Sequence, residues 1–280
     1  MITVVRRRRP TYRNVESKPP LHRIALCALV IWLVADPASS LAQQRVGDSP
    51  IVELTCQGPG EFRGSATGFF VNTAGNFVTA RHVIESLEIL AATDGCVIVA
   101  IVSQHGWSRR AKTLRVNECM KSPQQDLAVC RADPNPFDSL GFTASPAYML
   151  TTKQDHGATV VASGFPGDAM FKEPALVHAT VALYDNMQFE CKPFGGRWAV
   201  LSGPSVWLKS SQLSAATTEG MSGGPVLLSR EQHGEDDVVA MFVCFGAQHI
   251  IAIPADSIVK FLHLENVWIA RRSEPFVRLP

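Results

Sequence analysis

Three side chains in the sequence could together carry out nucleophilic catalysis: His82, Asp126 and Ser222. A serine hydroxyl attacks a carbonyl at neutral pH only if a neighbouring base removes its proton. Histidine suits that role, because its unperturbed pKa of about 6.5 lets it accept the proton and return it to the leaving group. A carboxylate behind the imidazole would hold its tautomer and stabilise the imidazolium. The pattern predicts acyl-transfer chemistry, with Ser222 as nucleophile, His82 as base and Asp126 as the partner of the base.

Ser222 lies in the glycine-rich segment 219–224 (EGMSGG). Glycine lets the backbone turn tightly and approach a substrate carbonyl that side chains would obstruct. We expect the N–H groups of Gly220 and Ser222 to point into one hollow and to stabilise a developing oxyanion. Each feature alone has a simpler interpretation, since glycine–serine turns and turn carboxylates are common. Their combination favours the catalytic interpretation.

The segments around these residues resemble the motifs of the chymotrypsin-fold (trypsin-like) serine peptidases, especially the bacterial HtrA-like branch. In chain order they are Gly68–Val71, Thr79–Val83, Asp126–Val129, Gly164–Gly167, Gly220–Pro225 and Ile251–Pro254. The resemblance implies a serine endopeptidase that cleaves protein or peptide substrates through an acyl-enzyme intermediate, without a cofactor or metal. It also implies a His82-Asp126-Ser222 triad and an oxyanion hole formed by Gly220 and Ser222. Too few residues follow Glu265 for the PDZ domain usual in HtrA-like proteins, so we expect none.

Two departures from the family concern activation and specificity. Met221 stands where digestive-type members have an aspartate that pairs with a new N-terminal ammonium, so that mode of activation is not expected. By the resemblance, Ala216 and Thr217 line the specificity pocket. Ala216 offers no carboxylate to bind arginine or lysine, which favours a small or medium apolar side chain in the substrate. Thr217 keeps a preference for glutamate open.

The main alternative to an active enzyme is a chymotrypsin-fold module that is catalytically silent or latent and acts by binding peptides or proteins. Such modules usually lose their activity through substitution of triad residues, and here all three triad residues are present. Their presence argues against the silent module. A latent enzyme that needs an activator stays open.

Short runs rich in valine, isoleucine and phenylalanine, separated by glycine, proline, asparagine and aspartate, predict an all-β fold. The runs are 51–56, 66–71, 76–79, 96–102, 127–131, 159–163, 177–184, 225–228, 238–244 and 250–253. Phe69–Val71 and Phe77–Thr79 flank a glycine-containing turn and predict a hairpin. Helices are predicted over Arg81–Leu90 and Asp256–Leu264.

The proline-containing stretch Ala132–Tyr148 predicts a surface linker between two β units. Together with the resemblance, this predicts two consecutive six-stranded β-barrels of chymotrypsin type, with a short C-terminal helix. We expect the first barrel over residues 43–137, with His82 and Asp126. The second is expected over residues 138–280, with Ser222.

Residues 1–42 are predicted to be a signal peptide. Ile24–Val34 is an apolar run of 11 residues after a basic stretch, and Ser40-Leu41-Ala42 offers small residues for cleavage after Ala42. A membrane span needs about 20 apolar residues, so no stable span is expected. An uncleaved anchor is the alternative. The sequence predicts an exported protein, periplasmic or secreted.

The charge of the chain is unevenly distributed. The whole chain has a formal net charge of +1, but residues 1–42 contain seven basic and two acidic residues, which leaves −4 on the rest. Phosphate binding needs clustered lysine and arginine, so a slightly acidic body argues against nucleic acid as the main partner.

Six cysteines remain after the predicted leader, which itself contains Cys27. They are Cys56, Cys96, Cys119, Cys130, Cys191 and Cys244. An even number in an exported chain suggests up to three disulfides, with 15 possible connectivities. No spacing typical of zinc sites occurs among them. Isolated buried thiols are the alternative.

Overall fold

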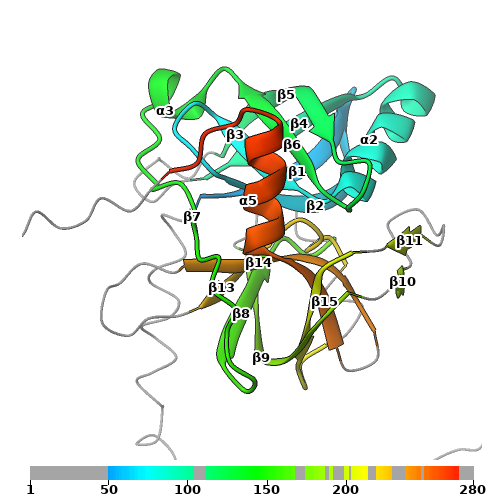
Figure 1. Ribbon diagram of the computed structural model, residues 1–280. Helices are drawn as coiled ribbons and strands as arrows, with labels where there is room; N and C mark the ends of the chain where they lie inside the picture. Colours follow the sequence, from blue (N-terminus) through cyan, green and yellow to red (C-terminus); the bar gives the residue numbers. More distant parts are fainter. Residues whose placement is uncertain are drawn as a thin grey trace, which may run out of the picture. The chain divides into compact units, whose positions relative to one another are not determined.

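The computed structural model describes residues 50–103, 111–167, 174–186, 189–191, 199–201, 203–213, 219–228, 237–246 and 249–270 (Figure 1). The predicted signal peptide, with Cys27, lies outside these residues, as do Ala216 and Thr217. In the described part of the chain no helix has the length and apolar character needed to cross a membrane.

The first six strands form a closed antiparallel barrel in the order β1-β2-β3-β6-β5-β4. They are β1 (Ile51–Gly58), β2 (Glu61–Phe70), β3 (Asn76–Thr79), β4 (Val97–Val102), β5 (Lys112–Lys121) and β6 (Ala128–Asp133). The predicted hairpin is confirmed, because Phe69 and Phe70 of β2 pair with Val78 and Phe77 of β3. Phe69, Phe70 and Phe77 are fully buried and form much of the barrel core.

The second barrel is built from six further strands, in the order β13-β8-β9-β12-β15-β14, and the pairing of β13 with β14 closes it. Their bounds are β8 (Thr159–Gly164), β9 (Ala175–Asp185), β12 (Ser205–Lys209), β13 (Pro225–Leu228), β14 (Asp237–Phe245) and β15 (His249–Pro254). The short β7 (Tyr148–Met149) adds parallel to β14. Strands β10 (Phe189–Cys191) and β11 (Ala199–Leu201) pair only with each other. The predicted all-β fold of two six-stranded barrels is confirmed.

Three helices are described. Helix α2 (Arg81–Asp94) follows β3 and ends at Gly95, whose left-handed conformation lets its N–H donate to the Ala91 carbonyl. Helix α5 (Ala255–Leu264) follows β15, as predicted. The predicted linker contains the one-turn helix α3 (Pro136–Ser139), begun by Pro136 and capped by the side chain of Asn135. The expected domain boundary at residues 137 and 138 falls inside α3.

The chain after α5 returns to the first barrel. The Ala270 N–H donates to the Val71 carbonyl at 2.9 Å. The side-chain amide of buried Asn72 donates to the Trp268 carbonyl at 2.8 Å. These bonds fasten the C-terminal segment to the β2–β3 turn, so both ends of the described chain contribute to the first barrel.

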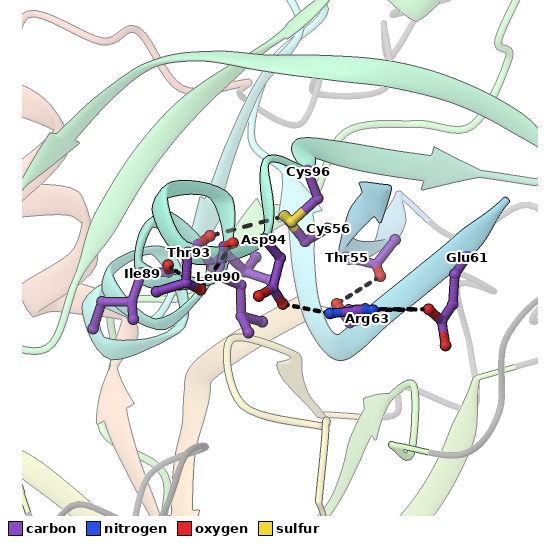
Figure 2. Close-up of a disulfide and its surroundings, with 10 residues drawn as sticks. Thr55, Cys56, Glu61, Arg63, Ile89, Leu90, Thr93, Asp94 and Cys96 are labelled. Atoms are coloured by element: carbon purple, nitrogen blue, oxygen red, sulfur yellow. Dashed lines mark hydrogen bonds and ion pairs between the residues drawn. A yellow bond between two sulfur atoms is a disulfide. The ribbon is translucent and has the colours of Figure 1, made fainter. Parts of the chain in front are cut away.

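Disulfides brace the first barrel at two places. Cys56 of β1 is bonded to Cys96, just before β4, and Cys119 of β5 is bonded to Cys130 of β6. Figure 2 shows the first bridge beside the end of α2, where Arg63 pairs with Asp94 at 2.6 Å. Cys244 is also disulfide-bonded. The prediction that cysteines form disulfides is confirmed, and the alternative of isolated thiols is wrong for these five residues.

Removing each of the two fully described disulfides should lower the free energy of unfolding by a different amount. A disulfide restricts the unfolded chain more when it closes a longer loop, and these bridges span sequence separations of 40 and 11 residues. We expect Cys56→Ser with Cys96→Ser to lower the free energy of unfolding by about 4 kcal/mol, and Cys119→Ser with Cys130→Ser by about 3 kcal/mol. Urea unfolding without reductant measures both values. A larger loss from the 119–130 pair would contradict the loop-length argument.

Candidate active site

The imidazole of His82 and the carboxylate of Asp126 form a buried pair. His82 is the second residue of α2, directly after β3, and Asp126 lies two residues before β6. These positions are close because β3 pairs with β6, with Thr79 opposite Ala128. The pairing of adjacent strands therefore brings together two residues 44 positions apart in the sequence.

Asp126 holds His82 at two points. Its Oδ1 accepts the backbone N–H of His82 at 2.8 Å, and its Oδ2 lies 2.6 Å from Nδ1 of the ring. An ionised carboxylate only accepts hydrogen bonds, so in the neutral imidazole Nδ1 is the nitrogen that carries the proton and Nε2 presents a lone pair. Both side chains are almost fully buried, at 7% and 1% exposure, which keeps competing water away from this bond. The arrangement fixes both the tautomer and the direction of the imidazole.

The turn that contains Ser222 packs directly against the end of β3. Gly223 has φ of +89°, and a Cβ atom there would overlap the carbonyl oxygen of Thr67 and the hydroxyl of Thr79. It would also lie 3.0 Å from the backbone nitrogen of Ala80. The residue after Ser222 therefore contacts the residues just before His82. Only glycine allows this approach of one backbone to another.

The hydroxyl of Ser222 donates to the backbone carbonyl of Val243 on β14, at 2.9 Å. Within the described ranges it makes no hydrogen bond to His82. Transfer of its proton to the imidazole requires that this bond break and that Oγ turn toward His82. The structure thus brings His82 and Asp126 into direct contact. It places the turn that contains Ser222 against the residues just before His82, with the Ser222 hydroxyl bonded to Val243.

The predicted oxyanion donors belong to peptide groups whose orientation is fixed. The carbonyl of Glu219 accepts the N–H of Gly167 at 2.6 Å. In a trans peptide the C=O and N–H point in opposite directions, so the N–H of Gly220 points away from Gly167. Neither this N–H nor that of Ser222 donates to a backbone carbonyl among the described residues. In the part of the chain that the structure describes, both donors therefore lack a backbone partner.

Glycine is also required at position 220. Its φ is +88°, and a Cβ atom there would overlap the Phe165 carbonyl and lie 2.8 Å from the nitrogen of Gly167. The predicted pocket residues Ala216 and Thr217 lie outside the described residues. Among those that are described, no three histidine, cysteine, aspartate or glutamate side chains gather closely enough to hold a metal ion.

Residues 66–241, which include His82, Asp126 and Ser222, match the family described as trypsin-like peptidase domain. The chain belongs to this family. The resemblance drawn from the sequence motifs is confirmed at this level. No curated protein matches the chain.

Solved structures of proteases share the fold of this trypsin-like chain. The active form of the Rv3671c protease from M. tuberculosis has a TM-score of 0.55 and 14% identity, over 94% of this chain and 97% of that one. Deg5 has a TM-score of 0.54 and 19% identity, over 82% and 96%. The MamO protease domain from Magnetospirillum magneticum has a TM-score of 0.54 and 18% identity, over 78% and 98%. At these identities the likeness shows the fold.

Sequence reasoning missed two residues that contact the Ser222 loop. Val243 accepts the Ser222 hydroxyl through its backbone, so its side-chain type contains no signal for that contact. Thr67 directly precedes the Gly68–Val71 motif and is fully buried on β2. Its hydroxyl donates to the carbonyl of Gly220. A buried threonine in a strand is common, and only the position beside a recognised motif could have drawn attention to it.

The crowding at Gly223 predicts a large loss of stability on Gly223→Ala. Gly60, in the turn between β1 and β2, provides a matched control because its φ is +81° and nothing lies within 4 Å of a Cβ placed there. Gly60→Ala should cost about 1 kcal/mol, the penalty for a left-handed L-residue alone. Gly223→Ala adds overlap with backbone, and we expect a loss of about 3 kcal/mol or more. Urea unfolding compares the two variants, and equal losses would contradict the close packing of this turn.

Proposed function

We propose that this protein is an exported serine endopeptidase that hydrolyses peptide bonds through His82, Asp126 and Ser222. The observation that carries the proposal is the double hold of Asp126 on His82, at 2.8 Å and 2.6 Å. A carboxylate that only stabilised the start of a helix would need no contact with the ring. Contact with Nδ1 leaves Nε2 as the proton acceptor, which is what a general base requires.

In the proposed reaction Ser222 is the nucleophile. Its Oγ leaves the Val243 carbonyl, turns toward Nε2 of His82 and attacks the substrate carbonyl as the imidazole takes the proton. The Oγ–C bond forms and a tetrahedral oxyanion develops. His82 then donates the proton to the leaving amine, which departs and leaves an acyl-enzyme. Water, deprotonated by the same imidazole, releases the acyl group and restores Ser222.

The oxyanion would be stabilised by the N–H groups of Gly220 and Ser222. Such donors are effective when their directions are fixed before the charge develops, because no reorganisation is then needed. The bond from Gly167 to the Glu219 carbonyl supports this, since it holds the peptide that contains the Gly220 N–H. The free state of both N–H groups among the described residues supports it further. Proteins and peptides are the proposed substrates, in keeping with the family.

Export is part of the proposal. One support is the predicted signal peptide in residues 1–42, in which a basic stretch precedes an apolar run. The other is the pair of disulfides in the first barrel, since disulfides persist in oxidising compartments. The periplasm and the external medium both meet this condition.

A latent form of the same enzyme is the second candidate, and the bond from the Ser222 hydroxyl to the Val243 carbonyl favours it. In a latent enzyme this bond would persist until a partner or peptide displaced it. A peptide-binding module without activity would keep the bond permanently. The three cases differ in how a fluorophosphonate probe, which reacts with activated serines, labels the protein.

Ser222→Ala should abolish casein cleavage by the full chain, with a loss of about 10⁵-fold or more, because no other group replaces the nucleophile. Labelling by a fluorophosphonate probe should disappear with it. Ser257→Ala, which removes another buried serine hydroxyl on α5, is the control and should retain both activities. Wild-type protein that is folded yet neither labels nor cleaves would refute the active enzyme. Weak labelling that rises when casein peptides are added would identify the latent form.

Asp126→Asn should lower kcat by about 10⁴-fold while the protein stays folded. An asparagine oxygen can still accept the backbone N–H of His82, but its NH₂ group then faces Nδ1 and favours the wrong tautomer. Steady-state cleavage of casein measures kcat, and circular dichroism checks the fold. Asp138→Asn on α3, an exposed carboxylate that bonds Asn135, is the control and should leave kcat unchanged. An equal kcat for Asp126→Asn and wild type would remove Asp126 from the proposed triad.

A further inference from the structure

Thr67 joins the first barrel to the loop that contains the proposed oxyanion donors. It lies on β2 and is fully buried. Its Oγ1 donates to the carbonyl of Gly220 at 2.8 Å and accepts the N–H of Phe165 at 2.9 Å. Its backbone N–H donates to the carbonyl of Ser222 at 3.0 Å. One residue therefore contacts the carbonyls of both residues whose N–H groups would bind the oxyanion.

The hydroxyl of Thr67 also contacts the turn that gives this loop its second support. Phe165 belongs to the turn after β8, and two residues later the N–H of Gly167 holds the carbonyl of Glu219. That carbonyl sets the direction of the Gly220 N–H, because the two groups belong to the same trans peptide. Thr67 Oγ1 thus fixes Gly220 from one side directly and from the other through the Phe165–Gly167 turn.

The hydroxyl of Thr67 is closely packed against Gly164. A Cβ atom at Gly164 would lie 2.8 Å from Thr67 Oγ1 and 3.0 Å from the Cα of Met221. Met221 is fully buried and uncharged, so it has no ion pair with which to hold the loop. A threonine hydroxyl has one proton to donate and lone pairs to accept, and here both capacities are used.

We propose that Thr67 is a positioning residue for the oxyanion hole, acting through Gly220 and the Phe165–Gly167 turn. The inference rests on the proposed serine-peptidase function. Without the hydroxyl, the Gly220 carbonyl and the Phe165 N–H would both lose their partner in a buried place. The peptide that contains the Gly220 N–H would then sample other orientations, which weakens the stabilisation of the oxyanion more than the binding of substrate.

The test uses Thr67→Val, which keeps the shape and removes the hydroxyl, in the full chain. Thr67→Ser restores the hydroxyl and should bring activity back to within about threefold of wild type. Thr55→Val is the matched control, because Thr55 is also a fully buried threonine of the first barrel and its hydroxyl donates to the Arg63 carbonyl, outside the proposed site. Casein is the substrate for kcat and KM, and a fluorophosphonate probe measures the rate of serine modification.

We expect Thr67→Val to lower kcat and the labelling rate by about 10- to 100-fold, with KM within about twofold of wild type. Thr55→Val should retain the kcat of the wild type, even if it lowers the melting temperature as much as Thr67→Val does. A merely structural role for Thr67 would lower the melting temperature and leave kcat and the labelling rate of the folded protein unchanged. That result would overturn the proposal, as would a Thr67→Ser variant as slow as Thr67→Val.

Amide hydrogen exchange separates failure of this proposal from failure of the proposed function. In Thr67→Val the Phe165 amide loses its acceptor and should exchange at least about tenfold faster, whereas Thr55→Val should leave it unchanged. Unchanged exchange at Phe165 would overturn the positioning role whether or not the protein cleaves casein. The amide of Phe165 could exchange faster in Thr67→Val although the wild type neither cleaves casein nor reacts with the probe. That outcome would support the structural contact of Thr67 with the loop. It would refute the peptidase function, and with it the catalytic part of this proposal.

Discussion

The candidate site depends on direct contact between backbones. A Cβ at Gly223 would overlap the Thr67 carbonyl, and one at Gly224 would overlap the carbonyl of Ser163. Hydrogen bonds run through the same contact, from Gly223 N–H to the Phe242 carbonyl and from Phe242 N–H to the Gly224 carbonyl, both at 2.8 Å. The Ser222 turn is therefore fixed between strands of both barrels. Because close-packed interiors do not deform continuously, this contact sets the position of Ser222 within narrow limits.

The pair of Asp126 and His82 illustrates how burial and hydrogen bonding act together. Burying a carboxylate costs free energy unless donors replace the lost water. Two donors of His82 meet this need, one from the backbone and one from the ring. The backbone bond belongs to the first turn of α2, where N–H groups lack partners within the helix. One carboxylate thus supports a helix start and orients a side chain on that helix.

The sequence allowed much of the fold to be predicted, because most strands bury apolar residues. All ten predicted runs lie largely or wholly within observed strands. Strand β5 (Lys112–Lys121) was missed because one of its faces is exposed and its charged residues hide the alternation. Strand β12 (Ser205–Lys209) has only three consecutive apolar residues, too few to stand out.

In the candidate site, too, the sequence shows residue types but not the contacts that depend on the fold. The types and order of His82, Asp126 and Ser222 can be read from the sequence because their chemistry requires particular side chains. The contact of Asp126 with both donors of His82 depends on the register of β3 and β6, which no local pattern specifies. The role of Thr67 depends on contacts more than 90 residues away in the sequence, at Phe165 and Gly220. Residue type alone does not distinguish it from other buried threonines.

The Ser222–Val243 hydrogen bond determines how much free energy is needed to turn the serine hydroxyl from its resting rotamer to a reactive one. A neutral hydrogen bond contributes about 1 kcal/mol net, so exchanging it for a bond to His82 would change the population of the reactive rotamer by about tenfold or less. Displacing His82 would be far more costly, because it would break two bonds to a buried carboxylate and leave that charge without donors. For the proposed reaction, the group that must move is therefore the side chain of Ser222, which rotates about a single bond. The imidazole of His82 and the backbone of Gly220 to Ser222 stay where packing holds them. In the proposed reaction, a substrate that enters the site needs to shift only this small equilibrium, so the latent form would need a further interaction that reinforces this bond.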